Sequence, residues 1–211
     1  MNELLLRGLQ RELKKPLPGI TAQRQMSARP SSGRRFDFKH SGPPKRGGVA
    51  LLLYPQQDKW MMPLMKRPSY QGVHGGQISL PGGKMEPHDP DIIQTALRET
   101  AEEIGVTIPR DRVLGTLSPL YIMASHYEVL PVVAMIDEVP EFRTDPREVQ
   151  DLIEVDLRVL MLPETRMTKE IQVRGTSIIA PYFGVMDEVV WGATAMILNE
   201  FLTVVREIPD Y

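Results

Sequence analysis

Hydrophobic residues along this chain follow two spacings, and the spacing changes from segment to segment. Alternating or continuous apolar runs predict strands, whereas an apolar residue every third or fourth position predicts a helix. The predicted strands cover 48–54, 60–65, 77–80, 113–122, 127–136, 151–156, and a hairpin of 171–174 and 176–181. The predicted helices cover 2–14, 91–104, 157–162 and 192–206. Mixed strands with a few helices indicate an α/β or α+β sandwich.

Two long segments follow neither spacing. Residues 27–47 are rich in Ser, Pro, Gly and Arg, which predicts an extended irregular connection. Residues 67–90 predict a long loop, and loops of this length inside a compact domain usually carry function. The helix predicted next, 91–104, has an apolar face, and Gly105 stands where its C-terminal cap is expected.

Composition narrows the class of protein. The chain has 211 residues, 42% of them hydrophobic and 25% charged, which fits one soluble domain with a sizeable core. It contains no cysteine, so disulfides, thiolate metal sites and cysteine nucleophiles are excluded. The first residues are too charged for a signal peptide, and no segment is apolar for long enough to span a membrane. We therefore expect a cytoplasmic protein without a membrane partner.

Charge divides the chain into two parts. Residues 1–46 hold 11 Lys/Arg and 3 Asp/Glu, whereas the remainder holds 14 against 24. We expect 1–46 to form a basic helix and arm packed on a domain formed by 47–211. The arm either attracts a polyanionic substrate or neutralises the acidic body. Nucleic acid is not an expected partner, because only Phe36 and Phe38 offer stacking surfaces in the arm.

Three acidic residues lie in the last turns of the helix predicted at 91–104: Glu99, Glu102 and Glu103. A helix C-terminus is partly negative, so acidic side chains are disfavoured there. Glu99 and Glu103 also repel each other, by about 0.2–0.5 kcal/mol. A bound cation would offset both effects, and Mg²⁺ prefers oxygen ligands of this kind. The alternative is an ordinary solvated helix face.

The loop before this helix strengthens the first interpretation. Gly82 and Gly83 allow the backbone to approach a ligand closely. Arg98, four residues before Glu102, is placed to hold that carboxylate by a forked contact. A divalent ion at such a site polarises water, which predicts hydrolysis of a phosphoanhydride.

These residues resemble a known motif. Gly83, Asp89 and the run 98–106 are similar to the Nudix box, G-x5-E-x7-R-E-U-x-E-E-x-G-U, although Asp89 replaces Glu and eight residues separate it from Arg98. The resemblance implies the Nudix fold, an α/β/α sandwich with a mixed sheet. It also implies Mg²⁺ or Mn²⁺ bound by Glu99 and Glu103, with help from Glu102 and the Gly82 carbonyl.

A longer stretch, 64–83, resembles the segment that marks coenzyme A pyrophosphatases within the Nudix superfamily. Arg67, Gly76 and residues 81–83 match that pattern, and Gly72 stands where a second Arg is expected. Segments 17–26 and 191–195 look similar to the same subfamily. The resemblance implies a small-molecule diphosphate substrate, with CoA cleaved to 3′,5′-ADP and 4′-phosphopantetheine. The alternatives are a diphosphatase for ADP-ribose, dinucleotides or nucleoside triphosphates, and a non-catalytic nucleotide-binding module.

The individual roles follow from these patterns. Arg67 binds phosphate or forms a salt bridge at a strand end, and His74 and Gln77 contact substrate or stabilise their loop. Glu148 supplies a further ligand, the general base, or only a surface charge, in competition with Asp151 and Glu154. The predicted catalytic residues are Arg98, Glu99, Glu102, Glu103 and Glu148, and the predicted substrate-binding residues are Arg67, His74, Gln77 and Gly83. The sequence is compatible with a homodimer.

Overall fold

The computed structural model describes residues 2–33, 36–69, 75–173 and 175–209. The helical elements are α1 (Asn2–Glu12), α2 (Ile20–Gln23), α3 (Ile92–Ile104), α4 (Leu157–Met161) and α5 (Gly192–Arg206), with short 3₁₀ turns η1 (Arg24–Met26), η2 (Arg110–Arg112) and η3 (Pro163–Thr165). The strands are β1 (Arg29–Pro30), β2 (Lys45–Gln56), β3 (Lys59–Lys66), β4 (Ile78–Ser79), β5 (Gly82–Lys84), β6 (Val113–Thr116), β7 (Leu120–Ile122), β8 (Tyr127–Met135), β9 (Asp151–Asp156), β10 (Arg166–Val173), β11 (Thr176–Val185) and β12 (Glu188–Trp191).

The larger sheet is mixed. Its centre is the parallel pair β2 and β8, in register from Lys45 opposite Tyr127 to Leu53 opposite Met135. The order is β4-β3-β2-β8-β6, with β5 added to β2, β7 to β8 and β9 to β3, all antiparallel. A smaller antiparallel sheet contains β1, β11, β10 and β12.

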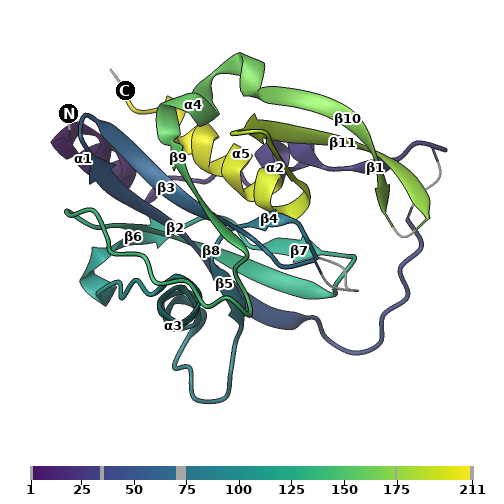
Figure 1. The fold of residues 1–211 in the computed structure, drawn as a ribbon, viewed down its shortest axis with the longest axis horizontal. Helices are drawn as coiled ribbons and strands as arrows, with labels where there is room; N and C mark the ends of the chain where they lie inside the picture. The colour runs from purple at the N-terminus through teal and green to yellow at the C-terminus, as the bar shows by residue number, and fades with distance from the viewer. Residues whose placement is uncertain (1, 34–35, 70–74, 174, 210–211) are drawn as a thin grey trace.

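Helices cover both faces of the larger sheet (Figure 1). On one face, α3 packs Leu97 and Ile104 against Leu52 and Ala134 of the central strands. On the other face, α5 fills the space between the two sheets and forms the main core with α1 and the strands. The predicted α/β/α sandwich with a mixed sheet is confirmed, and the smaller sheet adds a further layer beyond α5.

Most helix predictions match the structure within two residues. The structure splits the strand predicted at 113–122 into β6 and β7. The ladder stops there because the Ser118 N–H donates to Glu200 and Pro119 has no N–H to donate. The predicted hairpin is also longer, and its extension adds β12 through a turn at Met186 and Asp187, both with positive φ. Met-Asp lacks the Asn-Gly or Asp-Gly signature of such turns, so the sequence did not indicate it.

The N-terminal segment is fastened to α5 by a buried carboxylate. Glu200 is fully buried and accepts hydrogen bonds from the Gly19 N–H (3.0 Å), Gln23 Nε2 (2.8 Å) and the Ser118 N–H (3.2 Å). Hydrogen bonds to a charged group are the stronger ones, and they leave no oxygen of this carboxylate unpaired. Glu200 therefore joins α5 to the segment before α2 and to the connection between β6 and β7.

Replacing Glu200 by Gln tests this clamp. The amide nitrogen of Gln cannot accept a hydrogen bond, so at least one buried N–H loses its acceptor. We expect Glu200→Gln to lower the free energy of unfolding by about 2–3 kcal/mol in urea denaturation. The exposed Glu207→Gln at the end of the same helix is the control and should change it by less than about 0.5 kcal/mol. Equal stability of the two variants would contradict the clamp.

Candidate functional site

Two glycines place the sheet against the C-terminal half of α3. Strand β5 pairs with β2, so that Gly83 lies opposite Gly48 and Gly82 opposite Val49. A Cβ on Gly83 would lie 2.5 Å from the carboxyl carbon of Glu99, and Gly82 has a φ of 148°. Only glycine satisfies both positions. The two glycines thus allow the backbone of β5 to contact the acidic face of α3.

Glu103 is the most buried acid of the site, with 1% of its surface exposed. Its Oε2 accepts the Gly82 N–H at 2.7 Å, and its Oε1 lies 3.2 Å from Arg67 Nη2. Burial raises the pKa of Glu103 to about 8, although Arg67 and the Gly82 N–H act in the opposite direction. Burial also raises the pKa of Glu99. Two neighbouring carboxylates are thus held where the charged form is costly unless a cation is present.

Arg67 bridges the loop and the helix. Its Nε donates to Ser79 Oγ at 3.1 Å, and its Nη2 donates to the Gly82 carbonyl at 3.3 Å as well as to Glu103. The structure therefore shows the salt-bridge alternative for Arg67. Ser79 was not singled out by the sequence, because a serine on a two-residue strand carries no distinguishing pattern.

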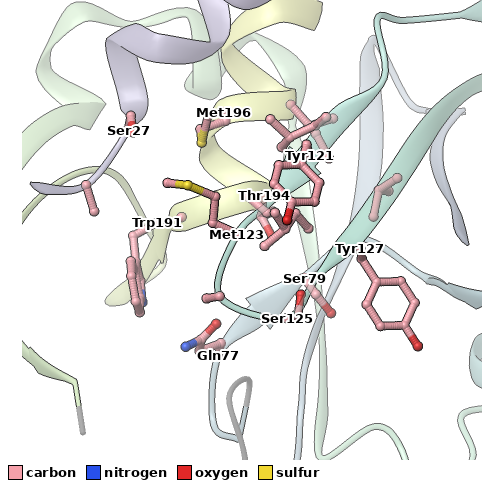
Figure 2. A pocket seen from close by; sticks show the side chains of 18 of the residues that line it. Ser27, Gln77, Ser79, Tyr121, Met123, Ser125, Tyr127, Trp191, Thr194 and Met196 are labelled. Carbon is pink, nitrogen blue, oxygen red and sulfur yellow. The ribbon is translucent and has the colours of Figure 1, made fainter. Parts of the chain in front are cut away.

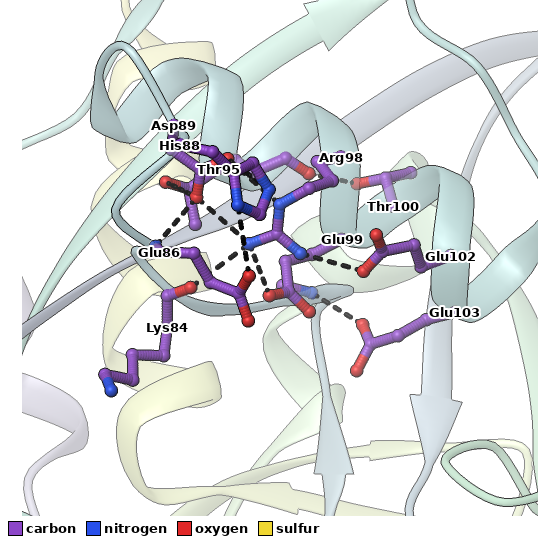
Figure 3. A network of polar contacts seen from close by, with 12 residues as sticks. Lys84, Glu86, His88, Asp89, Thr95, Arg98, Glu99, Thr100, Glu102 and Glu103 are labelled. Carbon is purple, nitrogen blue, oxygen red and sulfur yellow. Dashed lines mark hydrogen bonds and ion pairs between the residues drawn. The ribbon is translucent and has the colours of Figure 1, made fainter.

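Arg98 lies at the centre of the polar network in Figure 3. Its guanidinium donates to both oxygens of Asp89 at 3.0 Å, to Glu102 at 2.8 Å and to the Lys84 carbonyl, and it lies 2.9 Å from Glu99. Asp89 is buried and also accepts hydrogen bonds from Thr95 Oγ1 and the Glu86 N–H. Asp89, left without a role by the sequence, thus fixes the orientation of Arg98 despite the additional loop residue.

The remaining predicted residues are divided by the structure. Glu102 is exposed and points to Arg98 rather than to Gly82 (Figure 3). Glu148 is exposed on the loop before β9, and its charge contributes to the raised pKa values of Glu99 and Glu103. Glu154 accepts a hydrogen bond from the Tyr54 hydroxyl, which leaves it a poor competitor for the role of base. His74 lies outside the described residues.

The donor atoms of the site are those that a hard cation prefers. Among the described residues, no three acidic or imidazole side chains already converge on one point. Three oxygen ligands are nevertheless available. The Gly82 carbonyl and the Glu103 carboxylate both accept hydrogen bonds from Arg67, and the Glu99 carboxylate lies against Gly83. These residues fit a divalent cation once Arg67 exchanges Glu103 for another anion.

A cavity of about 800 Å³ opens beside this site. Arg67, Ser79, Gly82 and Gly83 line one part of it, and Gln77 lies on the same rim (Figure 2). The rest is lined by residues between 27 and 38 of the N-terminal arm, by the adjoining ends of β10 and β11, by β7 and the turn before β8, and by the start of α5; these include Met123, Trp191 and Met196. The sequence did not assign these residues to a site, because their approach depends on long-range packing.

Comparison with known proteins identifies the family. The family model named NUDIX domain matches residues 44–172, more than half of the chain. This chain belongs to the Nudix family. Residues 173–211, including all of α5, lie beyond the matched segment.

Several individual Nudix proteins are similar to the chain. Nudix hydrolase 22, chloroplastic, of Arabidopsis thaliana is 33% identical over 79% of this chain, which spans only 57% of that relative. Mitochondrial coenzyme A diphosphatase NUDT8 of Mus musculus is 34% identical over 71% of this chain and 68% of its own length. The crystal structure of the Nudix hydrolase RenU from M. smegmatis shares the fold, with a TM-score of 0.52, 18% identity, and coverage of 86% of this chain and 95% of that one.

The structure also bears on the membrane prediction. Within the described part of the chain, no helix has the length and apolar character that crossing a membrane requires.

The pair of Asp89 and Arg98 gives a testable stability prediction. Hydrogen bonds from Arg98 hold the pKa of Asp89 well below its usual range. We expect Asp89→Asn to lower the free energy of unfolding by about 1–3 kcal/mol at pH 7, because Arg98 and Thr95 lose a charged acceptor.

The pH dependence of this difference has a definite sign. A carboxylate with a depressed folded pKa stabilises the fold above its unfolded pKa, near 4, and loses this effect as the pH falls toward the folded value. The stability difference between wild type and Asp89→Asn should therefore be constant from pH 7 to about pH 5 and shrink below about pH 4. Asp111→Asn, at an exposed position, is the control. A difference that grows on acidification would refute the assignment.

Proposed function

We propose that this protein is a divalent-metal-dependent Nudix diphosphatase that hydrolyses CoA or acyl-CoA to 3′,5′-ADP and (acyl-)4′-phosphopantetheine. The observation that carries the reaction type is the burial of Glu103, with Glu99 beside it, against Gly82 and Gly83. Support for the substrate comes from the resemblance of 64–83 to coenzyme A pyrophosphatases and from the similarity to the coenzyme A diphosphatase NUDT8.

Each residue of the site has a separate role in this proposal. Glu99, Glu103 and the Gly82 carbonyl would hold Mg²⁺ or Mn²⁺, which would neutralise the diphosphate and lower the pKa of water. Arg67 leaves Glu103 and forms a bidentate contact with a substrate phosphate, a geometry that suits a guanidinium. Asp89 fixes Arg98, and Arg98 in turn holds the Glu99 carboxylate beside Gly83 and the exposed Glu102 carboxylate at the edge of the site.

The reaction itself is a displacement at phosphorus. A water oxygen attacks one phosphorus of the diphosphate, and the bond from that phosphorus to the bridging oxygen breaks. We assign the proton of that water to the carboxylate of Glu148, an exposed acid on the loop before β9 whose nearby charge helps to raise the pKa values of Glu99 and Glu103. Glu148 belongs to the loop between β8 and β9 and not to α3, which carries Glu99 and Glu103. Cytoplasmic location and a homodimer stay predictions.

A substrate panel tests the substrate. The protein is incubated with Mn²⁺ or Mg²⁺ and CoA, hexanoyl-CoA, ADP-ribose, a dinucleoside polyphosphate or a nucleoside triphosphate, and products are identified by mass spectrometry. We expect the highest kcat/KM for CoA or its thioester, with 3′,5′-ADP released. A higher kcat/KM for ADP-ribose or a dinucleotide would favour the alternative diphosphatase. Tight nucleotide binding without turnover of any compound would favour the non-catalytic module.

Glu103→Gln tests the reaction type. It keeps the shape of the side chain and removes its charge, so the metal loses a charged ligand. Mutating a residue that only supports a metal ligand typically lowers metal affinity or activity 10- to 100-fold. Because Glu103 would be a ligand itself, we expect its loss to lower kcat/KM by at least about 100-fold. Glu141→Gln, at an exposed position where the carboxylate pairs only with the exposed Arg143 among the contacts described, should retain wild-type activity. Full activity of Glu103→Gln would contradict the proposed role.

A further inference from the structure

The cavity beside the catalytic residues has two walls of different origin. One wall lies within the segment matched by the Nudix family and contains β7 and the turn at 123–125. The other lies outside it and contains residues 27–30 and the first turns of α5 (Figure 2). Segments 17–26 and 191–195, which the box leaves unexplained, are thus part of this second wall or its support.

The second wall is held in place by the Glu200 clamp. Glu200 binds Gly19 and Gln23, immediately before the stretch at 27–30, and it also binds Ser118, two residues before β7. Thr194 Oγ1 donates to the Ile78 carbonyl at 3.0 Å and fixes the start of α5 against β4. Hydrogen bonds to buried residues therefore hold the walls of the cavity in place.

The charges of the residues that line the cavity indicate which part of a substrate fits into it. Among the described residues that line the cavity, the cations are Arg67 and Lys84, both at the catalytic end, and the only other charged residue is Asp37. Away from the catalytic end, the second phosphate of a nucleotide would find no cationic partner among these described lining residues, which is costly. An uncharged arm carries no such penalty.

The lining also matches the chemistry of such an arm. Hydroxyl groups of Ser27, Ser125 and Thr194 interrupt a largely apolar surface, as an amide-containing chain requires. Met123, Met196 and Trp191 all belong to this lining (Figure 2). Methionine side chains adapt to flexible apolar chains of different length.

We propose that this cavity binds the uncharged, amide-containing arm on one side of the substrate diphosphate, and that its apolar part accepts an acyl group on the end of that arm. The nucleotide half then lies on the opposite side of Gly82 and Gly83. This inference rests on the proposed function, in which the arm is pantetheine, and it predicts that the thioester is a better substrate than free CoA. Each methylene buried in the cavity should raise kcat/KM by about two- to fourfold until the space is filled.

Ala193→Phe tests the cavity directly. Ala193 lines the cavity at the start of α5 and is not among the residues assigned to the reaction. In wild type we expect the ratio of kcat/KM for hexanoyl-CoA to that for CoA to be at least about 10, and in Ala193→Phe to fall to about 1. Leu4→Phe, on the exposed side of α1, is the matched control and should keep the wild-type ratio. Because the readout is a ratio within one preparation, partial loss of folded protein does not change it.

Two further measurements make the outcome decisive. Met196→Ala should move the best chain length upward, because it enlarges the same space. Calorimetric binding of S-hexanoylpantetheine, which has no diphosphate, should be detectable in wild type and at least tenfold weaker in Ala193→Phe. If CoA is not hydrolysed but this probe binds in that pattern, the proposed function fails and the cavity assignment stands. If CoA is hydrolysed and neither the acyl ratio nor probe binding responds to Ala193→Phe, the cavity assignment is overturned.

Discussion

The structure of this site depends on one electrostatic constraint: two neighbouring carboxylates, the buried Glu103 and the partly buried Glu99, lie together in the C-terminal half of α3. Burial disfavours their charged forms and raises both pKa values. In the structure, Arg67 and the Gly82 N–H partly compensate Glu103, and Arg98 compensates Glu99. A divalent cation would compensate both at once and release Arg67 for a phosphate. The glycines, the arginines and the helix end all serve this arrangement.

A second set of contacts extends the site beyond the Nudix segment. The buried Glu200 fastens the N-terminal segment and the connection between β6 and β7 to α5. This places α5 between the two sheets (Figure 1). Among the described residues that line the cavity next to Gly83, the cations Arg67 and Lys84 lie at the catalytic end. In the proposed function, the box residues carry the reaction, and the flanking segments complete one wall of the cavity that sets the substrate preference.

The sequence predicted those features that depend on local spacing. Helix α3, its Gly105 cap and the cluster of Glu99, Glu102 and Glu103 follow from residues close together in the chain. The turn into β12 and the split between β6 and β7 were not predictable in this way, because the first lacks a turn signature and the second depends on Glu200, some 80 residues away. The same holds for the cavity, whose two walls meet only through tertiary packing. The pairing of Asp89 with Arg98 lies between these cases, since the motif marked both residues but not their contact.

Direct measurement of metal binding tests the central claim that Glu99 and Glu103 form a site for a divalent cation. Mn²⁺ is titrated into the protein, and the amplitude of the free Mn²⁺ signal is followed by electron paramagnetic resonance. We expect at least one Mn²⁺ bound per chain in wild type, and at least tenfold weaker binding when Glu103 is replaced by Gln. Equal binding by the two proteins, or no binding by wild type in the presence of a diphosphate ligand, would contradict it.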